Sequence, residues 1–162
     1  MSKDDSTAYD TTDPCPIART LQIVGEKWTL LILRDIFRGK HRFNEIYENL
    51  RCPKNLLSSR LHALEETEII TRYSYKEQGK RTRAAYQLTE RGLALAPVLI
   101  ALGNWGTTYL PHNSAEAPTL IHNECGGKLI TRITCENSHD IPYPLPAHHE
   151  EKPVSPLTDM NP

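Results

Sequence analysis

The sequence lacks a hydrophobic run long enough to cross a membrane. Its longest run, residues 93–102, has ten residues and contains Pro97, whereas a transmembrane helix needs about 20. Cysteine is scarce: four in 162 residues are too few and too scattered for a disulfide scaffold, which favours a cytoplasmic setting. The sequence also has no Gly-rich phosphate loop, nucleophile elbow or paired acidic motif, so we do not expect an enzyme.

The net charge of −1 argues against a nucleic-acid partner only if the charge is evenly spread. It is not, because residues 15–110 carry a net charge of +6, while the leader before them carries −3 and residues 111–162 carry −4. Eight of the twelve prolines lie at or beyond Pro111, and such a composition is typical of linkers and disorder. We therefore divide the chain into an acidic flexible leader (1–14), a basic domain (15–110), a small Cys/His-containing extension (111–140) and a Pro-rich disordered tail (141–162).

Hydrophobic periodicity predicts four helices in the first part of the basic domain. They span residues 17–24, 28–37, 43–50 and 54–66. The last of them has a narrow stripe of leucines at helical spacing, which predicts its buried side. These leucines are Leu57, Leu61 and Leu64.

The opposite face of helix 54–66 has short hydrogen-bonding side chains, where a merely solvated helix would favour Lys and Glu. Side chains of this kind reach base edges when a helix enters the major groove of DNA. The DNA contacts expected from this helix are Lys54, Asn55, Ser58, Ser59 and His62. For this helix taken alone, an ordinary amphipathic helix is the alternative.

Two strands are predicted next, at residues 69–75 and 81–88, joined by a turn that contains Gly79. In the second strand, Ala85 is expected to share a face with the arginines. The tip of this hairpin gathers cations suited to phosphates, namely Lys76, Lys80, Arg81 and Arg83. A solvated hairpin that protects a sheet edge with charge is the alternative. The order of elements predicts a winged helix-turn-helix: a mainly α fold of the α+β class with a two-stranded β-wing.

A long C-terminal helix is expected over residues 90–110, with Thr89 as its N-cap. It is apolar on two sides, and one side can pack on its own domain while the other needs a partner. The two stripes are Leu95, Val98, Leu102, Trp105 and Tyr109, and Leu93, Ala96, Ile100 and Gly103. We expect the second subunit of a homodimer as the partner, since two-fold DNA readers pair half-sites in this way. Burial of the helix within a monomer is the alternative.

Several motifs of the basic domain resemble the HxlR-type family of bacterial winged-helix transcription regulators. They lie at residues 15–17 (Cys-Pro-Ile), 25–28 (Gly-Glu-Lys-Trp), 42–46 (Arg-Phe-Asn-Glu-Ile), 57–61 (Leu-Ser-Ser-Arg-Leu), 86–89 (Tyr-Gln-Leu-Thr) and 105–106 (Trp-Gly). The resemblance implies a small dimeric winged helix that represses or activates transcription. Two departures bear on the wing: Glu68 stands where the family usually has Gly, and Gly79 where a wing Pro is common.

Cys15 matches an N-terminal cysteine that some members of this family use to sense electrophiles or oxidants. It lies near a predicted helix start, where the helix dipole favours a thiolate. A half-buried structural cysteine is the alternative. Cys52, in the turn before helix 54–66, is a further thiol whose modification would disturb DNA docking.

The extension after the basic domain contains two Cys/His pairs at spacings that a tetrahedral Zn²⁺ accepts. The pairs are His122 with Cys125, and Cys135 with His139. A structural zinc is therefore one hypothesis, and a metal-free hairpin with incidental His and Cys is the other. We expect no cofactor to be required.

Taken together, these patterns predict a cytoplasmic, homodimeric, sequence-specific DNA-binding regulator. Its partner is a double-stranded operator, and a thiol-reactive or small-molecule effector is a further expectation. The alternative is a winged-helix module that binds protein instead of DNA, because Glu66 and Glu68 near the groove end would repel phosphates. Four cations on one hairpin favour DNA.

Overall fold

The computed structural model describes residues 12–76, 78–79, 81–110 and 120–141. The chain forms two compact units, residues 1–130 and 131–162, and each is considered by itself. Most of the predicted leader and nearly all of the predicted tail lie outside the described residues, as do residues 111–119. No helix in the described ranges is long and apolar enough to cross a membrane.

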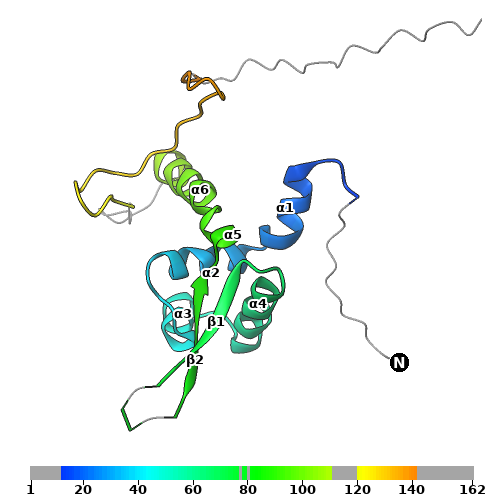
Figure 1. Cartoon of the computed structure of the whole chain (residues 1–162), viewed down its shortest axis with the longest axis vertical. Helices are drawn as coiled ribbons and strands as arrows, with labels where there is room; N and C mark the ends of the chain where they lie inside the picture. Colours follow the sequence, from blue (N-terminus) through cyan, green and yellow to red (C-terminus); the bar gives the residue numbers. More distant parts are fainter. Residues whose placement is uncertain (1–11, 77, 80, 111–119, 142–162) are drawn as a thin grey trace, which may run out of the picture. The chain divides into compact units, whose positions relative to one another are not determined.

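The first unit has helices and a two-stranded sheet in the predicted order (Figure 1). The elements are α1 (Pro16–Val24), α2 (Lys27–Phe37), α3 (Phe43–Leu50), α4 (Lys54–Glu66), β1 (Ile70–Tyr75), β2 (Arg83–Leu88), α5 (Glu90–Leu93) and α6 (Ala96–Tyr109). The predicted bounds of α3 and α4 are confirmed. The chain is thus mainly helical with a two-stranded antiparallel wing, as predicted.

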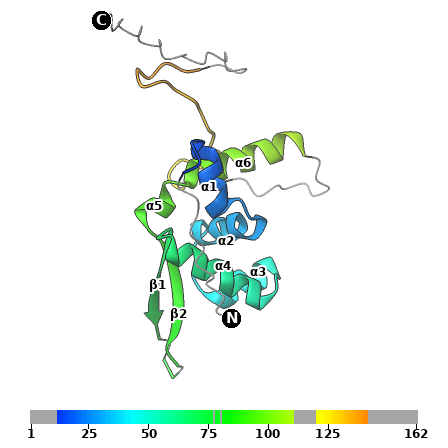
Figure 2. The same cartoon turned by 90° about the vertical axis from the view of Figure 1, so that its right-hand side faces the viewer.

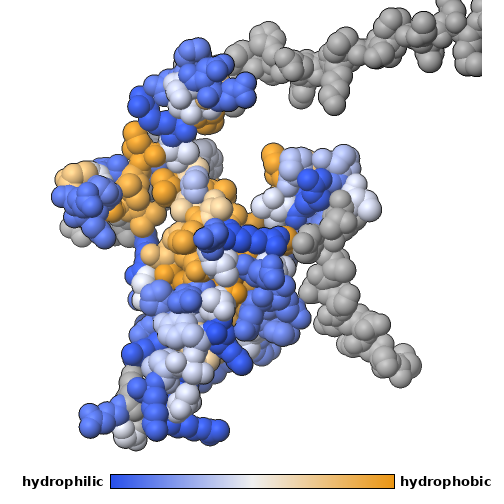
Figure 3. Space-filling view, viewed as in Figure 1, coloured by the Kyte–Doolittle hydropathy of each residue, from blue (hydrophilic) through white to orange (hydrophobic). Residues whose placement is uncertain are grey.

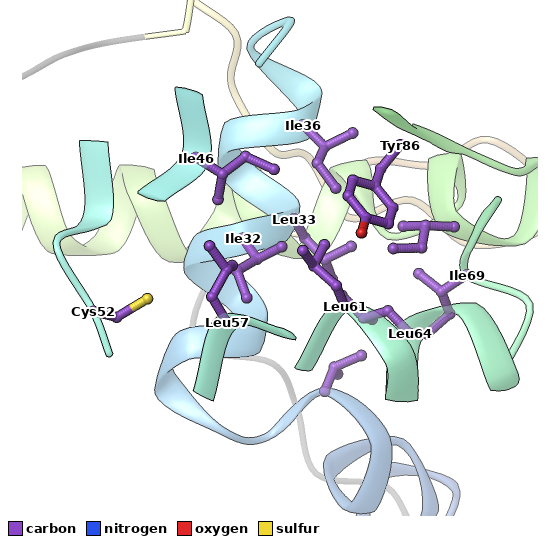
Figure 4. Close-up of a cluster of buried hydrophobic side chains, with 12 residues drawn as sticks. Ile32, Leu33, Ile36, Ile46, Cys52, Leu57, Leu61, Leu64, Ile69 and Tyr86 are labelled. Atoms are coloured by element: carbon purple, nitrogen blue, oxygen red, sulfur yellow. The ribbon is translucent and has the colours of Figure 1, made fainter. Parts of the chain in front are cut away.

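The core lies between α2 and α4 and is closed by α3 and the sheet (Figure 4). The predicted leucine stripe of α4 is confirmed, because Leu57, Leu61 and Leu64 are all at most 1% exposed. They pack with Ile32 and Leu33 of α2. Burying a side chain of this size stabilises the fold by about 1.5–3 kcal/mol, so this stripe fixes which face of α4 is left for solvent.

The wing is an antiparallel hairpin in which Ile70 pairs with Leu88 and Tyr75 with Arg83. The second strand begins at Arg83, so the predicted start at Arg81 is wrong by two residues. Ala85 lies two residues from Arg83 in this strand and so on the same face, as expected, but unlike the exposed Arg83 it is only 1% exposed.

The other edge of β2 explains the burial of Ala85. The segment before α3 pairs with it through a bridge from Arg42 to Ala85, and the Tyr86 amide donates to the His41 carbonyl at 2.8 Å. The Glu45 carboxylate in turn accepts hydrogen bonds from the His41 and Arg42 amides, at 3.1 and 3.0 Å. The wing is therefore attached to the start of α3.

The turn between α4 and β1 uses a left-handed residue that is not glycine. Glu68 has φ = 56°, and its amide donates to the Glu65 carbonyl while the Ile69 amide donates to the Leu64 carbonyl. These two bonds form a Schellman motif, which usually has Gly at the left-handed position. The departure at Glu68 thus falls where a side chain costs conformational energy.

The C-terminal helix is broken into α5 and α6 instead of running continuously over residues 90–110. Pro97 lies in the first turn of α6, where its missing N–H costs no intrahelical hydrogen bond, whereas in a helix interior it would. The predicted cap is confirmed, because the Thr89 hydroxyl accepts a hydrogen bond from the Gly92 amide at 3.1 Å. An added Cβ at Gly92 would collide with the Ile69 carbonyl, so α5 packs close against the end of β1.

Candidate nucleic-acid interface

The exposed face of α4 has the composition that the sequence predicts. All five side chains expected to contact DNA are exposed: Lys54, Asn55, Ser58, Ser59 and His62. The His62 side chain is 70% exposed, and its Nε2 lies 3.2 Å from Glu66 Oε1. The Lys54 ammonium lies 5.0 Å from the centre of the Tyr47 ring, which joins the start of α4 to α3.

A tight turn between α3 and α4 sets the direction of this face. Arg51, the C-cap of α3, is left-handed with φ = 51°, and Pro53 is the N-cap of α4, its carbonyl accepting from the Leu57 amide at 3.0 Å. Cys52 between them is 2% exposed and belongs to the core. A reagent in solution therefore has little access to this thiol, which weakens the hypothesis that it is a site of modification.

Arg60 lies on the flank of α4 and faces another element of the same chain. Its Nη2 lies 3.3 Å from Glu26 Oε2 at the start of α2, and its Nε is buried without a hydrogen-bond partner in the described structure. This ion pair ties α4 to α2, so Arg60 helps to position α4 within the fold.

The wing presents its cations to solvent at the end of the unit that also holds α3 and α4 (Figure 2). Lys76, Arg81 and Arg83 are exposed, and Lys80 lies outside the described residues. In the space-filling view the wing is mostly hydrophilic, whereas hydrophobic side chains gather where α2 and α6 lie (Figure 3). The polar face of α4 and the cationic wing therefore belong to the same end of the unit.

The structure adds two arginines that sequence reasoning missed. The Arg42 guanidinium lies over the Tyr75 ring at 4.5 Å, and Arg72 of β1 is 59% exposed, with its Nε 4.0 Å from Glu65 Oε1. Arg42 precedes α3 by one residue and is far from the wing in sequence, so only the bridge to Ala85 brings it there. Arg72 could have been found from strand alternation, which places it on the wing beside the cations at the tip.

Cys15 is exposed at the N-cap position of α1. The Cys15 amide donates to Asp13 Oδ1 at 2.8 Å, and the Cys15 carbonyl accepts from the Arg19 amide at 3.1 Å. The thiol is therefore accessible to reagents in solution. The alternative, a half-buried cysteine, is wrong, because Cys15 is exposed.

The residues proposed for zinc form two pairs, one in each unit. His122 Nδ1 and Cys125 Sγ lie 3.3 Å apart in a tight turn closed by hydrogen bonds between His122 and residues 126 and 127. Cys135 and His139 form a similar turn, in which the Cys135 amide donates to the His139 carbonyl at 3.1 Å, but they belong to the second unit. Nowhere in the described ranges do three or more donors gather to hold a metal, and the zinc hypothesis stays a prediction.

Comparison with known proteins agrees with this geometry. Residues 23–114 match the model of the HxlR-like helix-turn-helix family. An HTH-type transcriptional regulator of Mycobacterium tuberculosis, Rv3095, is 40% identical over 119 residues, which cover 74% of each chain.

Two solved structures extend the comparison to the fold. The crystal structure of PA1607 superposes with a TM-score of 0.73 at 27% identity, covering 86% of this chain and 97% of the other. The redox regulator HypR in its reduced form superposes with a TM-score of 0.53 at 29% identity, covering 58% of this chain and 92% of the other. The chain therefore belongs to the HxlR-like helix-turn-helix family, whose members are DNA-binding transcriptional regulators and not enzymes.

Proposed function

We propose that this regulator binds a specific double-stranded operator as a homodimer, with α4 in the major groove and the wing on the phosphate backbone. The observation that carries the proposal is the exposed face of α4, which presents Asn55, Ser59 and His62 at the same end of the unit as the cationic wing. Asn can form two hydrogen bonds with the major-groove edge of adenine, at N6 and N7, and Ser can accept or donate to different bases. A DNA partner places its action in the cytoplasm.

The homodimer part of the proposal rests on large apolar side chains that are exposed within the described residues. On α6, Trp105 is 56% and Tyr109 68% exposed, and on α1, Ile17 is 69% exposed. A soluble monomer rarely leaves so many large apolar side chains together in water. A second copy that covers them would also place two α4 helices on one duplex, as two-fold DNA readers require.

A thiol-reactive signal is the further part of the proposal, and it rests on the exposure of Cys15. The related protein HypR is described as a redox regulator and has been solved in reduced and oxidised forms. Treatment with a thiol oxidant is expected to change the operator affinity of the wild type and to leave that of Cys15→Ser unchanged. A response that persists in Cys15→Ser would remove Cys15 from the proposal.

Selection of duplexes from a random pool by the purified full chain tests the function. We expect enrichment of an inverted repeat whose half-sites lie about one helical turn apart, or a multiple of it. Recovery of no enriched sequence, together with no mobility shift on random duplex, would contradict DNA binding and leave the protein-interaction module.

A further inference from the structure

A cavity of about 1060 Å³ lies in the first unit between α2, α6 and the hairpin formed by residues 120–129. The hairpin is closed by a hydrogen bond from the Leu129 amide to the Leu120 carbonyl at 2.8 Å. Cavities that hold small molecules have volumes of about 300–1000 Å³, so there is room for a ligand of that class.

The walls of the cavity are apolar. They include Leu31 and Phe37 from α2, and Leu99 and Ile100 from α6, with Leu120 from the hairpin. The structure describes every residue of α6, and none of them is fully buried. The helix is nevertheless apolar on more than one side. Leu99 packs partly against the core, whereas Ile100 on the same face of α6 is not part of that cluster and borders the cavity.

One side of the cavity is cationic. Lys27, Arg34 and Arg38 line it, and because they are seven and four residues apart, they fall on one face of α2. None of the described lining residues is Asp or Glu. Arg34 is paired with buried Asp35 at 2.8 Å, which neutralises part of this charge, and the described lining still contains more cations than acids.

We propose that this cavity binds an amphiphilic anion, namely a carboxylate on an aromatic or aliphatic body. The apolar walls take the body, and the cationic face of α2 takes the carboxylate, which Arg and Lys bind through charge-assisted hydrogen bonds. A neutral ligand would leave these cations facing an apolar molecule, and a cationic ligand would be repelled by them.

The position of the cavity gives this site a route to the DNA-binding face. The opposite side of α2 supplies Ile32 and Leu33 to the core, where they pack with Leu57 and Leu61 of α4. A ligand that shifts α2 therefore acts on the helix proposed to read DNA. This consequence rests on the proposed function, whereas binding of the anion does not.

Gly103 offers a direct way to close the cavity. It lines the cavity, and an added Cβ there would meet no atom within 4 Å, so the backbone accepts a side chain at this position and Gly103→Leu takes up space at the cavity. Leucine is also the better helix former by almost 1 kcal/mol, which keeps the variant folded. Thr108→Leu is the matched control, because Thr108 is exposed on the same helix and does not line the cavity.

Isothermal titration calorimetry of the full chain with naphthalene-2-carboxylate, in the absence of DNA, tests the proposal. We expect saturable binding to the wild type and to Thr108→Leu, and binding weaker by about tenfold or more in Gly103→Leu, equivalent to 1.4 kcal/mol. The neutral naphthalene-2-carboxamide is expected to bind the wild type weaker by a similar factor. Lys27→Gln changes an exposed residue. In this variant the affinities of the carboxylate and the carboxamide should differ by a smaller factor than in the wild type.

Three results would overturn the proposal. They are no saturable binding of the carboxylate to the wild type, equal binding of the carboxylate and the carboxamide, and equal binding to Gly103→Leu and the wild type. Loss of a dimer in Gly103→Leu, with no binding of either probe to the wild type, would show that a second copy occupies the cavity. Because no DNA is present, failure of the operator experiment would leave this test unaffected.

Discussion

At the scale of single residues, the interface divides into groups suited to bases and groups suited to phosphates. Asn55 on the exposed face of α4 has an amide that can pair with a base edge, whereas Arg83 near the tip of the wing has a full charge. The first kind of contact gives sequence preference, and the second gives affinity for any duplex.

Asn55→Ala is therefore expected to cost about 1–3 kcal/mol on the selected operator and to relax preference at one position. Arg83→Ala should weaken binding to all sequences about equally and lower the salt slope by about one. Mobility-shift titrations on operator and scrambled duplex measure both. Arg132→Ala, which removes an exposed charge from the second unit, is the control, and an equal loss in that variant would contradict the assignment of Arg83.

Glu68 stores conformational energy at the end of α4. A left-handed non-glycine residue costs about 1–2 kcal/mol. Glycine removes this cost, but its greater freedom in the unfolded chain offsets part of the gain. Glu68→Gly should raise the free energy of unfolding by about 0.5–1 kcal/mol. Urea denaturation measures this change in the free energy of unfolding. The control is Glu48→Gly, within α3, which should lower the free energy of unfolding by a similar amount. A loss of stability in Glu68→Gly would mean that its side chain is needed.

Burial raises the pKa of the Tyr86 hydroxyl above 10.0, with a smaller opposing effect from Arg72. The folded state thus favours the protonated phenol, so this contribution to stability is present below pH 10 and is lost as the pH rises through the folded pKa. Tyr86→Phe should therefore reduce the fall in unfolding free energy as the pH rises above about 10. Tyr109→Phe, at a position that is 68% exposed, is the control, and equal curves for Tyr86→Phe and the wild type would contradict this.

At the scale of elements, α6 is the helix that the described chain leaves least covered. Trp105 and Tyr109 are 56% and 68% exposed and do not line the cavity. Leu99 and Ile100 line it, together with Leu102, which is 50% exposed. The two faces thus serve different purposes in this account: one contacts the second subunit, and the other contacts a ligand.

Trp105→Glu is expected to convert the dimer into a monomer with unchanged helix content. Loss of an aromatic residue at the centre of an interface costs about 2–4 kcal/mol, and burial of a charge costs more. Light scattering coupled to gel filtration gives the mass, with Thr108→Glu as the control. A dimer that survives Trp105→Glu would place the interface elsewhere.

The elements that could be predicted from the sequence are those that depend on local pattern. The leucine stripe of α4 and the Thr89 cap follow from spacing within one or two turns, and both are confirmed. The bridge from Arg42 to Ala85 and the pair of Arg60 with Glu26 join residues more than 30 apart. No periodicity records such contacts, which is why the burial of Ala85 was missed.

The candidate site was predictable to a similar degree. The exposed face of α4 follows from its leucine stripe, because the buried and exposed sides of a helix determine each other. The cavity was not predicted, since its walls come from α2, α6 and residues 120–129, which only the tertiary fold brings together. The second apolar side of α6 was nevertheless visible in the sequence.

At the scale of the whole molecule, the net charge of −1 conceals a basic domain of +6 between acidic ends. In a dimer the two basic domains would bring +12 to one duplex, and the acidic ends would limit binding to unrelated DNA. Affinity for DNA should therefore depend strongly on salt, while preference for the operator depends on α4.

The most direct test of this account measures affinity for the selected operator and for a scrambled duplex of equal length between about 50 and 200 mM salt. We expect affinity for both to fall steeply with salt, and the operator to bind at least about a thousandfold more tightly at physiological salt. Equal affinity for the two duplexes, or affinity that does not change with salt, would contradict the claim that this chain reads DNA sequence through α4 and holds the backbone through its wing.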